Sequence, residues 1–285
     1  MSFVMESEPA LDVRRDNATS PPPDIEQFSP ELESDTASRL RIGNLVAGVF
    51  HLVQSIVFLL IVTDFDLPVT TSFATDDPAL LQGAPPAEIL FDFRLGYGVA
   101  AFSFLSAFFH FFVATVGRRT YERALAHSQN PFRWIEYSLS SSVMIVLLVM
   151  LLGEYDVGAL IAIAGVNASM ILFGWLMERS NTPGAGNTDW YPFVFGCIAG
   201  IVPWIVAAIY FAGALGNAEE AVPPWVWGIF ITIFLLFNVF AINQFLQYKT
   251  VGKWRSYPFG EGIYIALSLI AKSALMWQVY LGTVR

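Results

Sequence analysis

The chain has 285 residues, of which 55% are hydrophobic and only 14% are charged, whereas an ordinary soluble domain has about 25% charged residues. Because so few charges cannot cover a water-exposed surface, the composition predicts an integral membrane protein. The formal net charge of −9, without any basic block, excludes a protein that binds nucleic-acid phosphates. The single cysteine, Cys197, excludes an intrachain disulfide and a cysteine-based metal cluster, and we expect no metal site.

The N-terminal segment differs in composition from the rest of the chain. Residues 1–38 contain nine of the 24 acidic residues and only two basic ones, with three consecutive prolines at 21–23. This pattern predicts a disordered acidic tail over residues 1–40, followed by a transmembrane domain over residues 41–285. The tail has no basic start and no early apolar core, so we do not expect a signal peptide.

Seven apolar stretches follow, each close to the roughly 20 residues that cross about 30 Å of hydrocarbon. They lie at 41–63, 93–116, 131–153, 157–177, 190–213, 223–247 and 260–283. The sequence therefore predicts an all-α membrane protein, a bundle of seven transmembrane helices. The one long loop, residues 64–92, contains the strand-forming run 69–73, so either a short β-hairpin or an irregular acidic loop is expected there.

Basic residues are divided very unequally between the two sides of the membrane that these spans define. Twelve lie on the side of the N-terminus, only Arg94 and Arg285 lie on the other side, and Lys272 falls inside the last span. Because basic loops stay in the cytoplasm, we expect a multi-pass protein of the cell membrane with a cytoplasmic N-terminus and an external C-terminus.

Lys272 lies near the middle of the last span, between apolar neighbours. A charge in hydrocarbon is costly and usually functional, and a desolvated lysine amine is a nucleophile that can form a Schiff base with an aldehyde. The alternative is a structural lysine that pairs with a carboxylate. Glu136 is the candidate partner in either case, because the other carboxylates are expected in the tail, in loops or at span ends. Glu136 is expected to lie nearer than Lys272 to the side of the membrane that holds the N-terminus. The two side chains extend toward one another and make up this difference in depth only in part.

Several long strings of the transmembrane part are similar to the heliorhodopsins, retinal photoreceptors that are inverted in the membrane. These strings are residues 48–54, 132–142, 165–170, 196–204 and 268–274. The resemblance extends over about residues 41–285 and leaves out the acidic tail. It implies all-trans retinal bound covalently to Lys272 as a protonated Schiff base, with Glu136 as the counterion.

The resemblance also implies a retinal pocket built from further residues of the spans. These are Tyr137, Ser141, Asn167, Met170, Pro203, Phe237, Ser268 and Trp277. Their types suit this function, because aromatic and methionine side chains can enclose a polyene, and hydroxyl and amide groups can adjust the charge near the nitrogen. Ordinary packing in the bilayer is the alternative for any one aromatic residue in a chain so rich in phenylalanine.

Two histidines, His51 and His110, fall in the N-terminal-side halves of the first two spans, which run in opposite directions. They can therefore be neighbours, and Gln54 lies one helical turn from His51. The resemblance implies a region that accepts a released proton here. Two neutral imidazoles that form hydrogen bonds in a helix interface are the alternative.

Residues that a proton pump needs are replaced in this sequence. Pumping rhodopsins resemble one another in having a carboxylate one turn before the retinal lysine, where this chain has Ser268, and a second one where it has Leu147. The third span continues outward as an apolar run over 143–149, which a proton cannot cross unaided. We therefore expect a light sensor, not an enzyme or a pump, that signals to a cytoplasmic protein. A light-gated ion or proton conductor is the main alternative, and a small-solute transporter without a chromophore is a third.

Small residues recur at four-residue spacing in two spans, as in Gly165 with Ser169 and Gly196 with Gly200. Such pairs allow helices to approach closely, either within the bundle or at a dimer face, with packing inside the bundle favoured. We also expect a homodimer in membrane lipid.

Overall fold

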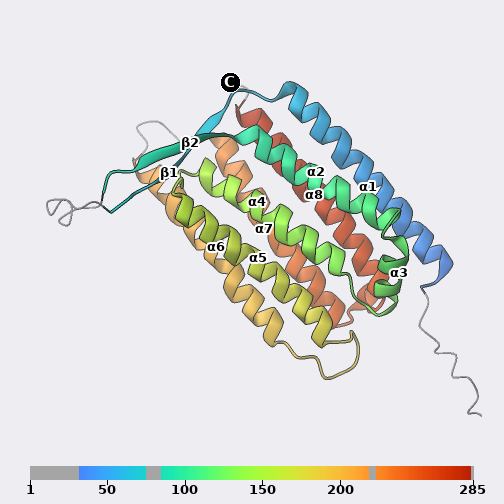
Figure 1. Ribbon diagram of the computed structural model, residues 1–285. Helices are drawn as coiled ribbons and strands as arrows, with labels where there is room; N and C mark the ends of the chain where they lie inside the picture. The colour runs from blue at the N-terminus through green and yellow to red at the C-terminus, as the bar shows by residue number, and fades with distance from the viewer. Residues whose placement is uncertain (1–31, 75–84, 218–222, 284–285) are drawn as a thin grey trace, which may run out of the picture. The chain divides into compact units, whose positions relative to one another are not determined.

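The computed structural model describes residues 32–74, 85–217 and 223–283. Within these residues, seven helices are long and apolar enough to cross a membrane, so the predicted fold class is confirmed (Figure 1). They are α1 (Ser34–Ile61), α2 (Leu95–Ala114), α4 (Pro131–Leu151), α5 (Val157–Ser180), α6 (Tyr191–Asn217), α7 (Pro224–Tyr248) and α8 (Tyr257–Thr283). Two short elements connect them on the N-terminal side, the helix α3 (Arg118–Ala126) and the 3₁₀ helix η2 (Gly252–Arg255).

The first helix begins at Ser34, inside the segment that the sequence assigns to the tail. Asp35 lies in its first turn, where a negative charge interacts favourably with the helix dipole. Leu40 is buried in a small cluster that includes Val113 of α2 and Tyr121 of α3. The expected tail over residues 1–40 is therefore wrong for residues 34–40, which belong to the helical bundle, and its part over residues 1–31 lies outside the described part of the chain.

The turn between α4 and α5 is short because the chain carries the residues that a tight turn requires. Gly153 has a φ of +108°, a conformation that favours glycine. Asp156 caps α5 by accepting a hydrogen bond from the backbone N–H of Ala159. At the other end of α4, Asn130 provides the same kind of cap and Pro131 occupies the first turn.

The long loop forms a two-stranded antiparallel sheet, so of the two alternatives the hairpin is confirmed. Strand β1 (Asp66–Thr71) pairs with β2 (Glu88–Arg94), with an irregularity after Val69. Val69 is buried against the main apolar cluster, and the backbone N–H of Thr70 donates a hydrogen bond to the carbonyl of Tyr155. The hairpin is thus fixed to the α4–α5 turn.

The helices pack as a series of neighbours that runs from α7 through α8, α1, α2, α4 and α5 to α6. α1 packs against α2 and α8, α4 packs against α2 and α5, α6 packs against α5, and α7 packs against α8.

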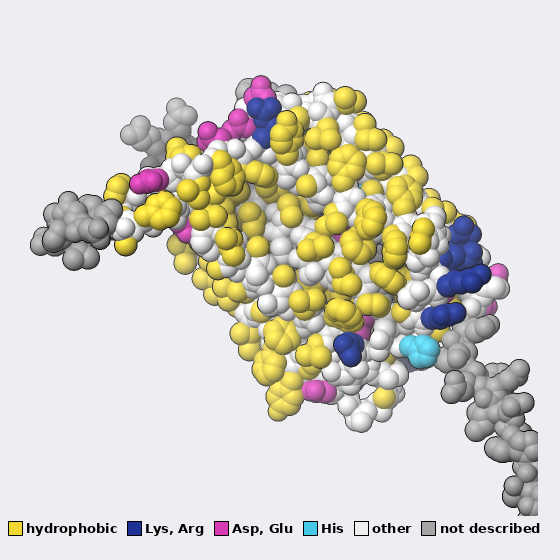
Figure 2. All heavy atoms as spheres, viewed as in Figure 1, with side chains coloured by type: hydrophobic (Ala, Val, Ile, Leu, Met, Phe, Trp, Pro, Cys, Tyr) yellow, Lys and Arg dark blue, Asp and Glu magenta, His cyan; other side chains and the backbone are white. Residues whose placement is uncertain are grey.

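Hydrophobic side chains cover the visible face, and Lys and Arg side chains gather at the end that carries α3 (Figure 2). The exposed basic residues of α3 include Arg119 and Arg123.

The two small-residue pairs have different surroundings. Gly196 and Gly200 face α5, where a Cβ on Gly200 would come within 2.4 Å of Met170 Sδ. Gly165 has nothing within 4 Å of its Cβ position and, like Ser169, it is exposed. Gly196 and Gly200 therefore allow close packing inside the bundle, whereas Gly165 and Ser169 lie on the outer surface of α5.

Candidate functional site

Lys272 of α8 and Glu136 of α4 form a buried ion pair. Lys272 Nζ lies 2.9 Å from Glu136 Oε1, and each residue is only 4% exposed. Lys272 also donates a hydrogen bond of 2.8 Å to Ser268 Oγ, one helical turn earlier. Ser106 Oγ of α2 donates one of 2.6 Å to the same carboxylate oxygen of Glu136. The Lys272 and Glu136 side chains therefore meet, although the sequence places them at different depths in the membrane. Ser106 is a further partner of Glu136 that sequence reasoning missed.

The amine of Lys272 borders a cavity of about 300 Å³, at the lower end of the range for small-molecule sites. Eight of its lining residues are aromatic, namely Trp134, Tyr137, Phe193, Trp204, Phe234, Phe237, Phe240 and Tyr264. A glycine allows one of these rings to approach, because a Cβ on Gly174 would lie 2.4 Å from the Trp134 ring. The cavity is therefore suited to an apolar ligand that reaches the Lys272 side chain.

The predicted pocket residues divide into two groups. Tyr137, Ser141, Met170, Phe237 and Ser268 line the cavity together with Lys272. Asn167, Pro203 and Trp277 are not among its lining residues, and their contact with a ligand stays a prediction.

Two of these other residues have polar partners elsewhere. Asn167 donates hydrogen bonds to Ser141 and Ser142, and the Trp277 indole donates one to Gln54. Sequence reasoning missed Trp134, although it shares one face of α4 with Tyr137 and Ser141 at helical spacing, which is the signal that could have found it.

The cavity opens between α6 and α7 toward the outside of the bundle. Aromatic side chains join these helices on both sides of the opening, with Trp204 against Phe237 at 5.7 Å and Phe193 against Phe245 at 6.0 Å between ring centroids. Between these contacts, lining residues of the cavity such as Cys197 are exposed on the surface. An apolar ligand can therefore reach the cavity from the hydrocarbon layer.

The structure brings His51 and His110 together, with their rings stacked at a centroid distance of 5.6 Å. His51 Nδ1 lies 3.3 Å from Ser103 Oγ, and His110 Nδ1 lies 2.7 Å from Asn44 Oδ1. Gln54 is not part of this pair, because its amide oxygen accepts the hydrogen bond from Trp277. A proton-accepting role for the three residues stays a prediction.

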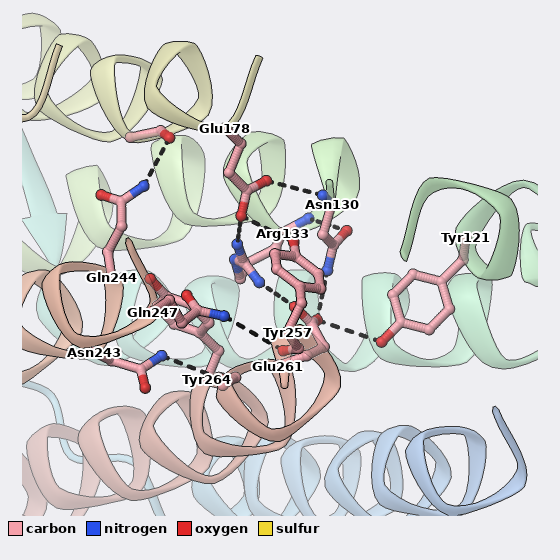
Figure 3. A network of polar contacts seen from close by, with 12 residues as sticks. Tyr121, Asn130, Arg133, Glu178, Asn243, Gln244, Gln247, Tyr257, Glu261 and Tyr264 are labelled. Carbon is pink, nitrogen blue, oxygen red and sulfur yellow. Dashed lines mark hydrogen bonds and ion pairs between the residues drawn. The ribbon is translucent and has the colours of Figure 1, made fainter. Parts of the chain in front are cut away.

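A second group of buried charges lies on the N-terminal side of the bundle (Figure 3). Arg133 of α4 pairs with Glu178 of α5 and with Glu261 of α8, and the two glutamates are 1% and 2% exposed. Both glutamates lie near a helix end, as expected from the sequence, but they are buried inside the bundle. The predicted spans end at 177 and begin at 260, whereas α5 continues to Ser180 and α8 begins at Tyr257, which places both carboxylates inside the bundle.

Neighbouring polar groups complete this Arg133–Glu178–Glu261 cluster. Glu178 accepts hydrogen bonds from the Tyr257 hydroxyl and the Asn130 backbone. Glu261 accepts them from the Asn130 amide at 2.6 Å and from the Tyr121 hydroxyl at 3.3 Å. The Arg133 guanidinium also lies 3.9 Å from the centre of the Tyr264 ring, a cation–π contact.

Replacing Arg133 with methionine should strongly destabilise the protein. The substitution leaves two buried carboxylates without a cation, and removing one partner of a buried pair costs about 3–5 kcal/mol. The matched control is Arg118→Met, which removes the partly exposed pair with Glu122 and should cost about 0.3–0.5 kcal/mol. Thermal unfolding in detergent micelles measures both, and similar losses from the two variants would contradict the importance of the cluster.

Comparison with known proteins agrees with the predicted fold. Among solved structures, the chain is similar to xanthorhodopsin, described as a light-driven ion pump with dual chromophore, with a TM-score of 0.59, 13% identity, and coverage of 88% of this chain and 94% of that chain. At this identity the likeness shows the fold. A search of curated proteins finds no match. The sequence model of the heliorhodopsin family matches residues 40–284. With a family match over nearly all of its transmembrane part, the chain belongs to the heliorhodopsins, a family of multi-pass membrane photoreceptors with a retinal chromophore.

Proposed function

We propose that this protein is a light sensor that binds all-trans retinal through Lys272, with Glu136 as the counterion, and signals to a cytoplasmic protein. The observation that carries the proposal is the buried Lys272–Glu136 pair at the edge of the aromatic cavity. A buried amine with a single close carboxylate is the arrangement that a cationic retinal linkage needs, because the carboxylate compensates the charge in hydrocarbon.

The residues around the cavity fit this group. Retinal would supply visible absorption and a light-driven change of shape. Trp204, Phe237 and Met170 would enclose its apolar part, and Glu136 and Ser268 would hold the proton at Lys272 Nζ. Ser106 would keep the Glu136 carboxylate in place.

The surroundings of Lys272 favour a sensor over a pump. Toward the hairpin end of the bundle, Met144, Ile145, Leu147 and Leu148 of α4 are each 2% exposed or less, and residues 143–151 include no titratable side chain. Toward the N-terminal side, the nearby groups are polar and titratable, beginning with His110. A proton that leaves Lys272 thus has acceptors on one side and can return from that same side.

Reconstitution with all-trans retinal tests this function. A sensor should show a visible absorption band, and illumination of a voltage-clamped cell that contains the protein should give no photocurrent. A visible band with a photocurrent would support the alternative, a light-gated conductor. No visible band at all would contradict both.

The orientation is part of the proposal, and it rests on the twelve basic residues on the N-terminal side against two on the other. In intact cells, a tag at the N-terminus should be protected from added protease, whereas a tag at the C-terminus should be cleaved. Lysed cells, in which both tags are accessible, are the control. Cleavage of the N-terminal tag alone in intact cells would reverse the assignment.

A further inference from the structure

A small second cavity connects the Lys272 site with the Arg133–Glu178–Glu261 cluster. It has a volume of about 30 Å³, enough for a water molecule. Glu136 and His110 line it from the photochemical site, and Tyr121, Arg133 and Glu261 line it from the cluster. Glu178 is not among its lining residues. A proton can therefore reach Glu261 from Glu136 or His110 through one small polar space.

The charge of the cluster makes it a proton acceptor. Arg133 supplies one positive charge, whereas Glu178 and Glu261 supply two negative charges when both are ionised. Glu261 contacts Tyr121 from α3, Asn130 before α4 and Arg133 from α4, and the charge of Glu178 from α5 also acts on it. The cluster thus has one negative charge in excess, and one added proton makes it neutral.

We propose that Glu261 is the group that receives the proton released from Lys272, and that its protonation transmits the signal to α3. The inference rests on the proposed function. One N–H bond at Lys272 breaks and one O–H bond at Glu261 forms, so that net negative charge moves from the cluster to Glu136. The unpaired Glu136 then favours return of the proton, which restores the resting state without transport.

Glu261 is a better final acceptor than His110 or Glu178. His110 already donates or accepts a hydrogen bond at Nδ1, and a second proton would make it a buried cation. Glu178 pairs with Arg133 and is separated from the small cavity. His110 is therefore a transfer point, and the proton stays on Glu261.

The Arg133–Glu178–Glu261 cluster also contacts residues 118–130, the segment that contains α3 and leads to α4. Tyr121 of α3 and Asn130, in the connection to α4, both donate hydrogen bonds to Glu261 (Figure 3). Burial raises the pKa of the Tyr121 hydroxyl well above its usual value, and the charge of Glu261 raises it further, so this group remains a donor. Protonation of Glu261 weakens these bonds and the pair with Arg133, because charged acceptors bind more strongly than neutral ones. Residues 118–130 should then become less firmly attached to α8.

Light-minus-dark infrared difference spectroscopy of the full chain with bound all-trans retinal tests the acceptor. When illumination replaces the visible band with near-ultraviolet absorption, a C=O band of a protonated carboxylic acid should appear, and labelling with ¹³C-glutamate should shift it. Glu261→Gln should remove this band and Glu261→Asp should shift it. The matched control, Glu154→Gln, changes a buried glutamate in the turn between α4 and α5 and should retain it.

The outcomes separate this inference from the proposed function. If the visible band forms and responds to light, an unchanged carboxylic-acid band in Glu261→Gln, or a band that only Glu178→Gln removes, overturns the inference alone. If Glu261→Gln does not fold, an unshifted band in Glu261→Asp overturns it. The absence of a visible band in the unmodified protein overturns the proposed function instead.

A second measurement does not depend on retinal. Glu261→Gln removes the charge permanently, so amide hydrogen exchange over residues 118–130 of the full chain should be faster than in the unmodified protein and in Glu154→Gln. Where Glu261→Gln does not fold, Glu261→Asp, which keeps the charge but withdraws it by one methylene, replaces it. Unchanged exchange in this segment would overturn the coupling to α3.

Discussion

Replacing Lys272 with alanine should abolish the visible absorption band completely. The chain has three lysines, and Lys249 and Lys253 follow the last residue of α7, so the substitution leaves no lysine amine at the aromatic cavity. Absorption spectra of the purified protein after incubation with all-trans retinal measure the effect. Lys253→Ala, which changes an exposed residue of η2, is the control and should retain the full band.

The same substitution has a cost for folding that must be separated from the loss of colour. Without the Lys272 amine, the Glu136 carboxylate is buried with Ser106 as its remaining partner, and an unpaired buried charge costs about 3–5 kcal/mol. The double variant Lys272→Ala with Glu136→Gln removes both charges and should unfold at a higher temperature than Lys272→Ala. A covalently bound visible band in either variant would contradict the assignment of Lys272.

Replacing Glu136 with glutamine should convert the dark protein from visible to near-ultraviolet absorption at neutral pH. The carboxylate lies 2.9 Å from Lys272 Nζ, and such an opposite charge shifts a protonation equilibrium by roughly 1–3 pH units. Without it, burial opposes the positive charge, and the visible form should persist only at lower pH than in the unmodified protein. Where the visible form remains, its band should move to longer wavelength, because a weaker counter-charge lets positive charge spread along the polyene.

A spectrophotometric pH titration with and without halide measures this effect, because an anion such as chloride can replace the carboxylate. The control is Glu178→Gln, which neutralises a buried carboxylate whose partners are Arg133, Asn130 and Tyr257. The control should titrate much like the unmodified protein. An identical titration of Glu136→Gln and the unmodified protein, in the absence of halide, would mean that another group acts as the counterion.

Much of the fold could be predicted from the sequence because hydrocarbon imposes a simple rule on the chain. A span must be apolar over about 20 residues, so the seven helices are visible as composition alone. The sequence does not distinguish the hairpin from an irregular loop, because the strand-forming run is short and the stability of the hairpin comes from tertiary contacts. Val69 packs on the main core, and Thr70 bonds to the α4–α5 turn. The start of α1 at Ser34 depends on contacts of Leu40 with α2 and α3. Such contacts between distant segments cannot be predicted from the residues next to Ser34 in the sequence.

The sequence by itself determined the membrane class, the seven spans, and the pairing of Lys272 with Glu136, because a charge inside an apolar stretch is conspicuous and needs a partner. Only the tertiary structure decided which polar residues at the span ends are buried. Arg133, Glu178 and Glu261 belong to three different helices. In the sequence, each lies near the end of an apolar stretch, where charged residues are common at a membrane boundary. Their charges are stable inside the bundle only because packing brings them within contact of one another. That mutual compensation depends on distances between helices, which hydropathy along a single chain does not contain.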